Sequence, residues 1–169
     1  MIATLDHVAD LPDWGQLGIV SARLLLAGVL GGCLGFERER LGKVAGLRTH
    51  MLVSMGSALF VLSALESGMQ IGDLSRVIQG IATGLGFIGA GVILKLREQE
   101  EIRGVTTAAN IWITAAIGLA VGIGQLWPAV CATLLAIIVL TVLYQFEKLI
   151  NAHAASDRLP PREPPGGSN

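Results

Sequence analysis

The sequence has few charged residues and few cysteines for its length. Charged residues make up 15% of the 169 residues, whereas soluble domains carry about 25%. The mean hydropathy is +0.64. An intrinsically disordered chain is excluded, because disorder needs low hydrophobicity and high net charge. Nucleic-acid binding is disfavoured as well, since the formal net charge is −1 and no basic face is visible.

The two cysteines make neither a disulfide framework nor a metal-binding motif. Cys33 and Cys131 both lie in apolar stretches, and we interpret them as small packing residues. The sequence has no evident Ser/His/Asp or Cys/His arrangement, and no zinc or phosphate motif. It therefore indicates a protein that is not an enzyme.

The apolar residues are gathered into long blocks. Residues 105–146 contain no Asp, Glu, Lys or Arg, which is long enough for two crossings of a hydrocarbon core about 30 Å thick. A soluble bundle would keep a polar stripe along each helix, and this block has none. Pro128 suits the first turn of a second helix. We predict an all-α integral membrane protein with five spans, near residues 17–36, 49–66, 77–95, 105–123 and 127–146.

The basic residues predict the orientation of these spans. Most of them fall in the loop after the first span, the loop after the third span, or the C-terminal tail. By the positive-inside rule these segments face the cytoplasm. We therefore predict an extracytoplasmic N-terminal segment at residues 1–16 and a transmembrane domain at 17–148. Residues 149–169, which are rich in Pro and Gly, are predicted to be a disordered cytoplasmic tail.

A glycine-rich run at residues 84–91 matches G-x-G-x-x-G. It lies in a predicted span without a surrounding βαβ unit, so a dinucleotide site is disfavoured. One interpretation is close helix packing through small residues. The other is a locally unwound helix whose carbonyl groups bind an ion. The glycines concerned are Gly84, Gly86, Gly89 and Gly91 of this run, together with Gly118 and Gly122.

Glycines also recur four residues apart, in the pairs Gly28/Gly32, Gly31/Gly35, Gly80/Gly84 and Gly118/Gly122. This spacing is typical of helices that approach closely in a membrane. We therefore expect the first, third and fourth spans to form a tight bundle.

One charged residue lies inside a predicted span. Arg23 is six positions after Leu17, which places it about 9 Å into the first span. A charge at this depth either snorkels to the interface or pairs with an opposite charge. Glu66 is the nearest candidate partner by depth, followed by Asp73. In either case we expect Arg23 to face the bundle.

The loop after the first span is the densest polar cluster. Its basic residues suit a solvated loop near anionic headgroups, but carboxylates do nothing for topology. Glu37 and Glu39 are therefore candidates to pair with Arg48 or to bind a hydrated Mg²⁺ ion. Threonines at the starts of the second and fourth spans are candidate helix caps, and Asn110 needs a partner helix or a cavity. The candidate residues are Glu37, Arg38, Glu39, Arg40, Lys43, Arg48, Thr49, His50, Thr106, Thr107 and Asn110.

Two stretches carry a resemblance to a known family. Residues 31–58 read GGCLGFERERLGKVAGLRTHMLVSMGSA, and residues 84–94 read GLGFIGAGVIL before GVTTAANIWITAAIGLAVG at 104–122. With these stretches the chain resembles the MgtC/SapB family of bacterial inner-membrane proteins. The motif residues that the resemblance identifies are Gly35, Glu37, Arg38, Glu39, Arg40, Lys43, Gly46, Leu47, Arg48, Thr49, His50, Gly86, Gly89, Gly91, Thr106 and Thr107.

The resemblance implies a role in growth at low Mg²⁺ and, in pathogens, in survival within host cells. Some relatives are thought to restrain the F-type ATP synthase, and the family is not established as a magnesium transporter. We expect a short form without the soluble C-terminal domain of longer relatives.

Two functional hypotheses follow. The first is a non-enzymatic protein without a cofactor that contacts a second copy or another membrane protein, for which the resemblance suggests the F-type ATP synthase. The alternative is a small ion or solute transporter with a site between the first, third and fourth spans, motivated by Arg23, Glu37, Asn110 and the glycine run.

Overall fold

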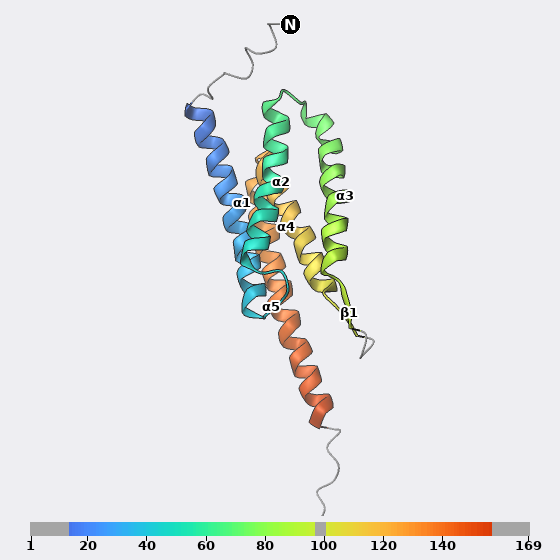
Figure 1. Cartoon of the computed structure of the whole chain (residues 1–169). Helices are drawn as coiled ribbons and strands as arrows, with labels where there is room; N and C mark the ends of the chain where they lie inside the picture. Colours follow the sequence, from blue (N-terminus) through green and yellow to red (C-terminus); the bar gives the residue numbers. More distant parts are fainter. Residues whose placement is uncertain (1–13, 97–100, 157–169) are drawn as a thin grey trace, which may run out of the picture. The chain divides into compact units, whose positions relative to one another are not determined.

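The computed structural model describes residues 14–96 and 101–156 of the chain, and five α-helices account for most of them (Figure 1). The predicted segment 1–16 lies mainly outside the described residues, as do residues 157–169 of the predicted tail. Every predicted span corresponds to one helix. The elements are α1 (Trp14–Arg40), α2 (Leu47–Glu66), the 3₁₀ turn η2 (Ile71–Asp73), α3 (Leu74–Val92), β1 (Leu94–Leu96), β2 (Glu101–Arg103), α4 (Val105–Ile123) and α5 (Leu126–Ser156).

Four of the helices are long and apolar enough to cross a membrane. They are α1, α2, α4 and the part of α5 from Leu126 to Phe146. The prediction of a multi-pass helical membrane protein is therefore confirmed. Helix α3 is 19 residues long but is not among the four. Five glycines, together with polar residues such as Arg76 and Gln79, lower its hydropathy.

The chain divides into two compact units after Ala136. The first unit holds α1 to α4 and the beginning of α5, and the second begins at Ile137. Helix α5 continues to Ser156, so the prediction of a disordered tail from residue 149 is wrong for residues 149–156. These residues include three alanines and no proline, and alanine has the highest helix propensity.

Helix α2 is the central element of the first unit, because it packs against both α1 and α4. The contact with α1 depends on glycine. A Cβ atom at Gly31 would lie 2.6 Å from the carbonyl oxygen of His50, and one at Gly35 would lie 2.7 Å from the Cα atom of Leu47. These separations leave no room for a side chain, so the backbones of α1 and α2 are in direct contact.

Glycines of α4 face α2 in the same way. A Cβ atom at Gly118 would overlap the carbonyl oxygen of Ser54, and one at Gly122 would lie 2.8 Å from the carbonyl oxygen of Ala58. The tight bundle therefore consists of α1, α2 and α4, and the expected bundle of the first, third and fourth spans is wrong. The glycines of α4 pack against Ser54 and Ala58 of α2, whereas Gly28 and Gly32 of α1 pack against the methionine side chains Met55 and Met51 of α2.

The glycine run of α3 shows neither local unwinding nor close packing against another described helix. Helix α3 is continuous from Leu74 to Val92, so the local unwinding of residues 84–91 that one of the two interpretations required is not found. Cβ atoms at Gly80, Gly84, Gly86 and Gly91 would meet nothing within 4 Å, and one at Gly89 would meet only Ala108 at 3.7 Å. These glycines therefore make no close packing contact within the described part of the chain.

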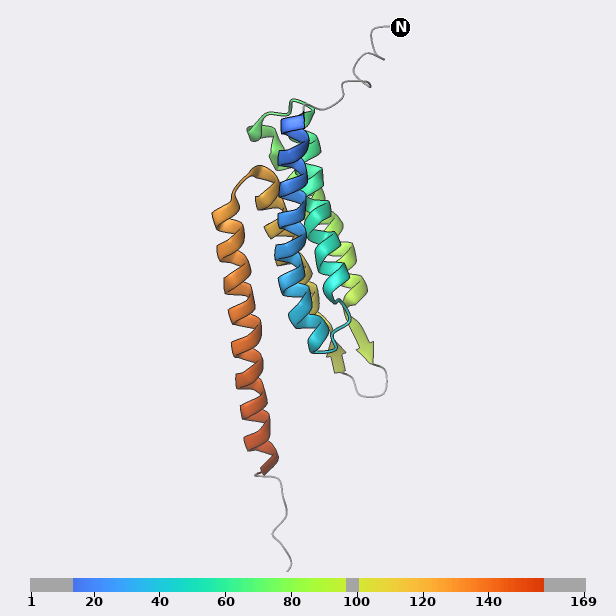
Figure 2. The same ribbon diagram turned by 90° about the vertical axis from the view of Figure 1, so that its left-hand side faces the viewer.

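A short antiparallel hairpin, absent from the sequence prediction, joins α3 to α4. Strands β1 and β2 pair with Leu94 opposite Arg103 and Leu96 opposite Glu101. Figure 2 shows the hairpin at the end of the unit where α1 also ends. The two loops that follow the first and third spans therefore lie at one end of the bundle, and we call it the basic end.

Candidate functional site

Buried polar side chains gather between α1, α2 and α4 toward the basic end. We call this group the polar cluster. Its members are almost inaccessible, with exposed fractions from 0% for His50 to 4% for Arg38. Burying polar groups in an apolar bundle costs free energy unless they are hydrogen-bonded. The members are Arg38 of α1, His50 and Ser54 of α2, and Thr107 and Asn110 of α4.

Arg38 joins the end of α1 to the start of α4. Its guanidinium group donates a hydrogen bond from Nη2 to the hydroxyl oxygen of Thr107, at 3.2 Å. Thr107 therefore accepts a hydrogen bond from another helix. The prediction that Thr107 caps α4 is wrong. The residue that precedes α4 is Gly104, whose φ of 98° is in the left-handed region, and no side chain caps this helix.

His50 joins α2 to α4. Its Nδ1 atom lies 2.8 Å from the carbonyl oxygen of Gly46, and its Nε2 atom lies 2.9 Å from the amide nitrogen of Asn110. Both distances are satisfied when Nδ1–H donates to the carbonyl and Nε2 accepts from the amide. Asn110 thus has the partner helix that the sequence predicted for it.

Glu39 holds the start of α2. Its carboxylate accepts a hydrogen bond from the backbone N–H of Leu47 at 2.7 Å, which satisfies one of the free donors of the first helical turn. A Cβ atom at Gly46 would lie 2.8 Å from the same carboxylate oxygen, so glycine leaves room for this bond. Helix α2 thus begins two residues before Thr49, and the prediction that Thr49 caps it is wrong.

The remaining basic residues of this region lie at its surface. The guanidinium carbon of Arg40 is 5.2 Å from the centre of the Phe36 ring, a cation–π contact. Lys43 and Arg48 are exposed. They lie outside the polar cluster, so the structure divides the predicted loop motif into a buried part and a surface part.

Arg23 has neither of the partners that were expected. Its Nη1 atom donates to the carbonyl oxygen of Gly122 at 3.1 Å, so neither Glu66 nor Asp73 is its partner. A cation there lies beside the C-terminus of α4, where the helix dipole favours positive charge. The expectation that Arg23 faces the bundle is confirmed.

Four buried side-chain atoms in the described residues lack a hydrogen-bond partner. They are Oε2 of Glu37, Nε of Arg38, Oγ of Ser54 and Oδ1 of Asn110. Three of these atoms belong to the polar cluster. Among residues 14–96 and 101–156, no three His, Cys, Asp or Glu side chains are close enough together to hold a metal ion. The proposed Mg²⁺ ligands Glu37 and Glu39 therefore gain no third carboxylate from the fold.

Sequence reasoning missed Ser54, although a signal for it existed. Ser54 lies four residues after His50 on α2, and Thr114 lies four residues after Asn110 on α4. Polar residues at this spacing share one face of a helix. The cysteines were interpreted as packing residues, but Cys33 and Cys131 are both exposed.

Apolar spanning helices, with a buried polar cluster at one end, define a multi-pass helical membrane protein. Its particular identity follows from comparison with known families. The profile of the MgtC family matches residues 24–149, and the chain belongs to this family. No solved structure matches the chain.

Several curated relatives are similar over most of this chain. SrpB of Synechococcus elongatus is 47% identical over 132 residues, which cover 72% of this chain and 71% of that protein. YhiD of Escherichia coli (strain K12), whose name carries a proposed role as a magnesium transporter, is 46% identical over 73% of this chain and 60% of its own length. MgtC of Salmonella typhimurium is 39% identical over 76% of this chain and 54% of its own length.

Proposed function

We propose that this protein serves adaptation to low magnesium from the bacterial inner membrane, and that it acts without catalysis by contacting a helix of another membrane protein. Support for the magnesium role comes from family membership and from the names of relatives. The match covers 60% of YhiD and 54% of MgtC from Salmonella. The role is therefore proposed for the part of these proteins that the chain matches.

The observation that carries the contact model is the contrast between glycines that contact α2 and a glycine that contacts no other helix. Cβ atoms at Gly31 and Gly35 of α1, and at Gly118 and Gly122 of α4, would meet atoms of α2. A Cβ atom at Gly86 of α3 would meet nothing within 4 Å. Ala82, Gly86 and Ala90 are spaced four apart on α3, and small residues at this spacing let a second helix approach closely in a bilayer. Gly86 and Ala90 are both exposed.

The hydrogen bonds of the polar cluster favour a rigid arrangement of α1, α2 and α4. Arg38 donates a hydrogen bond to Thr107 of α4, and His50 accepts one from the amide of Asn110 of α4. Such bonds between helices hold their relative positions in a membrane. We infer that α1, α2 and α4 form the support on which α3 presents its outer face.

A complementation experiment tests this function. A strain without the gene should regain growth at low Mg²⁺ when it carries the wild-type chain, and should not regain it with Gly86→Leu. The added side chain would keep a second helix at a distance. Gly18→Leu is the matched control, because a Cβ atom at Gly18 also meets nothing within 4 Å. Equal growth with Gly86→Leu and wild type, at equal protein levels in the membrane, would contradict the contact model.

The transporter alternative has its own supporting observation. Partnerless buried oxygens of Glu37, Ser54 and Asn110 are the ligand type that Mg²⁺ prefers. A transport site would then lie between α1, α2 and α4 rather than between the first, third and fourth spans. Uptake of Mg²⁺ into liposomes that contain a Mg²⁺-sensitive dye, and its loss in Glu37→Gln, would favour transport over contact.

A further inference from the structure

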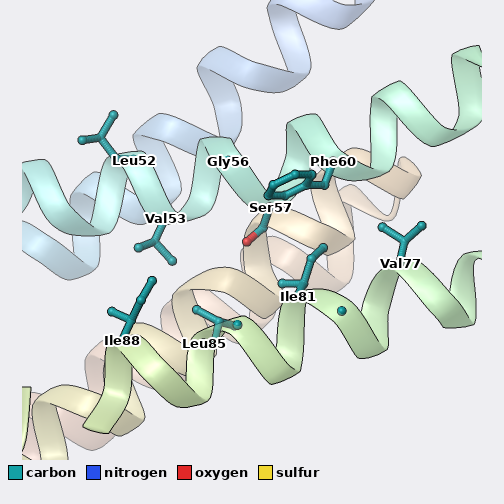
Figure 3. Close-up of a pocket in the computed structure, with 11 residues that line it drawn as sticks. Leu52, Val53, Gly56, Ser57, Phe60, Val77, Ile81, Leu85 and Ile88 are labelled. Atoms are coloured by element: carbon teal, nitrogen blue, oxygen red, sulfur yellow. The ribbon is translucent and has the colours of Figure 1, made fainter. Parts of the chain in front are cut away.

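A groove of about 650 Å³ runs between α2 and α3. Figure 3 shows side chains of both helices along it, among them Leu52 and Phe60 of α2 and Ile88 of α3. Ser57 is the one hydroxyl residue that lines it, and its side chain is only 5% exposed. The occupant of this groove must therefore be almost wholly apolar.

Glycines create the space. Gly56 of α2 and Gly80 and Gly84 of α3 all line the groove, and a Cβ atom at any of them would meet nothing within 4 Å. Glycine lowers helix stability relative to alanine. Three glycines that contact no neighbouring helix are accounted for if the space that they leave is used by a ligand.

The length of the groove is close to the thickness of one leaflet of the hydrocarbon core. Leu52 and Phe60, which line the groove on α2, are eight residues apart. That separation corresponds to a rise of about 12 Å along the helix. One leaflet of the hydrocarbon core is about 15 Å thick, whereas a spanning helix of a partner would extend over about 30 Å. The volume is also in the range of about 300–1,000 Å³ that small-molecule sites occupy.

A positive charge stands at one end of the groove. Arg48, Leu52, Gly56 and Phe60 follow one another at intervals of four residues, so they share one face of α2. Arg48 is exposed and lies at the basic end. Helical side chains tilt toward the N-terminus, so the Arg48 side chain extends away from the groove and toward the level of lipid headgroups.

We propose that the groove between α2 and α3 binds one acyl chain of an anionic phospholipid, and that Arg48 binds the phosphate of its headgroup. The apolar lining takes the chain, and the guanidinium group matches the phosphate in charge and geometry. The site is distinct from the contact face at Gly86, because Gly86 does not line the groove.

Native mass spectrometry tests the proposal. The chain is purified in mild detergent and exposed to equal amounts of phosphatidylglycerol and phosphatidylcholine with identical acyl chains. The wild type should retain one phosphatidylglycerol. Gly84→Leu should lose bound lipid of both kinds, because the new side chain fills the groove. Arg48→Gln should still bind lipid, but its preference for phosphatidylglycerol should fall about fivefold, the effect of one basic residue at an anionic surface.

Gly18→Leu is the control and should bind lipid as the wild type does, since Gly18 lies on α1 and does not line the groove. Thermal melting of each variant shows whether it is folded. The proposal is overturned if folded Gly84→Leu retains lipid at the wild-type level, or if Arg48→Gln keeps the full preference. The proposal is also overturned if the wild type is a dimer without lipid and Gly84→Leu is a monomer. The groove would then bind a second copy of the chain. The lipid-binding result does not depend on the growth experiment, so either proposal can fail without the other.

Discussion

At the scale of single residues, the polar cluster depends on contacts between positions that are far apart in sequence. Arg38 and Thr107 are 69 positions apart, and His50 and Asn110 are 60 apart. The sequence predicted that a buried amide such as Asn110 needs a partner. It could not identify that partner as His50, because only the packing of α2 against α4 brings the two side chains together.

Replacing Asn110 by leucine should destabilise the folded chain. The substitution removes the donor to His50 Nε2 and leaves a buried imidazole nitrogen without a partner, which costs about 1–3 kcal/mol. We expect a lower midpoint of thermal unfolding in detergent. Thr106→Val is the control, because Thr106 is exposed on the same helix. Equal midpoints for Asn110→Leu and wild type would show that the bond contributes no stability.

The bond between Glu39 and the start of α2 predicts a second, smaller effect. Glu39→Ala removes the acceptor of the Leu47 N–H, and loss of a helix cap costs about 0.5–2 kcal/mol. Gly46→Ala should displace the same carboxylate. Both changes remove the same hydrogen bond, between the Glu39 carboxylate and the Leu47 N–H. Their effects on the free energy of unfolding should therefore not add in a double-mutant cycle. Simple additivity would contradict this account.

At the scale of the elements, the five helices could be predicted because uncharged blocks of the required length are visible in the sequence. Their partners could not. Spacing of four residues shows that Gly118 and Gly122 share a face, but does not show what that face meets. In the structure the neighbour is α2. That helix has little glycine of its own, and it provides Ser54 and Ala58 as the small residues at the contact.

Alanine substitutions should distinguish glycines in close contact with another helix from glycines without such a contact. At Gly118 the new Cβ atom would overlap the backbone of Ser54, and overpacking of this kind costs about 1–3 kcal/mol. At Gly86 the new atom meets nothing within 4 Å, so Gly86→Ala should be neutral or slightly stabilising. Thermal unfolding of both variants in one detergent measures the difference. Equal loss at the two positions would refute the close packing of α4 against α2 at Gly118.

At the scale of the whole molecule, the main question is whether α3 crosses the membrane, since it is not among the four helices that are long and apolar enough to do so. The bond between Arg38 and Thr107 places the end of α1 beside the start of α4. The hairpin that precedes α4 also follows α3. Helix α3 therefore has to return from the far end of α2 to the basic end. Its 19 residues cover about 28 Å at 1.5 Å per residue, close to the hydrocarbon thickness.

Reporter fusions test this path directly. Alkaline phosphatase is active only outside the inner membrane, and green fluorescent protein fluoresces only inside. If α3 crosses, a fusion after Gln70 should give phosphatase activity, whereas fusions after Lys95 and after Asn169 should fluoresce. This orientation is the one that the positive-inside rule predicts, because the basic residues Arg40, Lys43 and Arg48 favour a cytoplasmic position for the loop after α1. If α3 lay along the surface, the fusion after Lys95 would give phosphatase activity like the one after Gln70. The two basic loops would then face opposite sides, although the Arg38–Thr107 bond ties them to one end of the bundle.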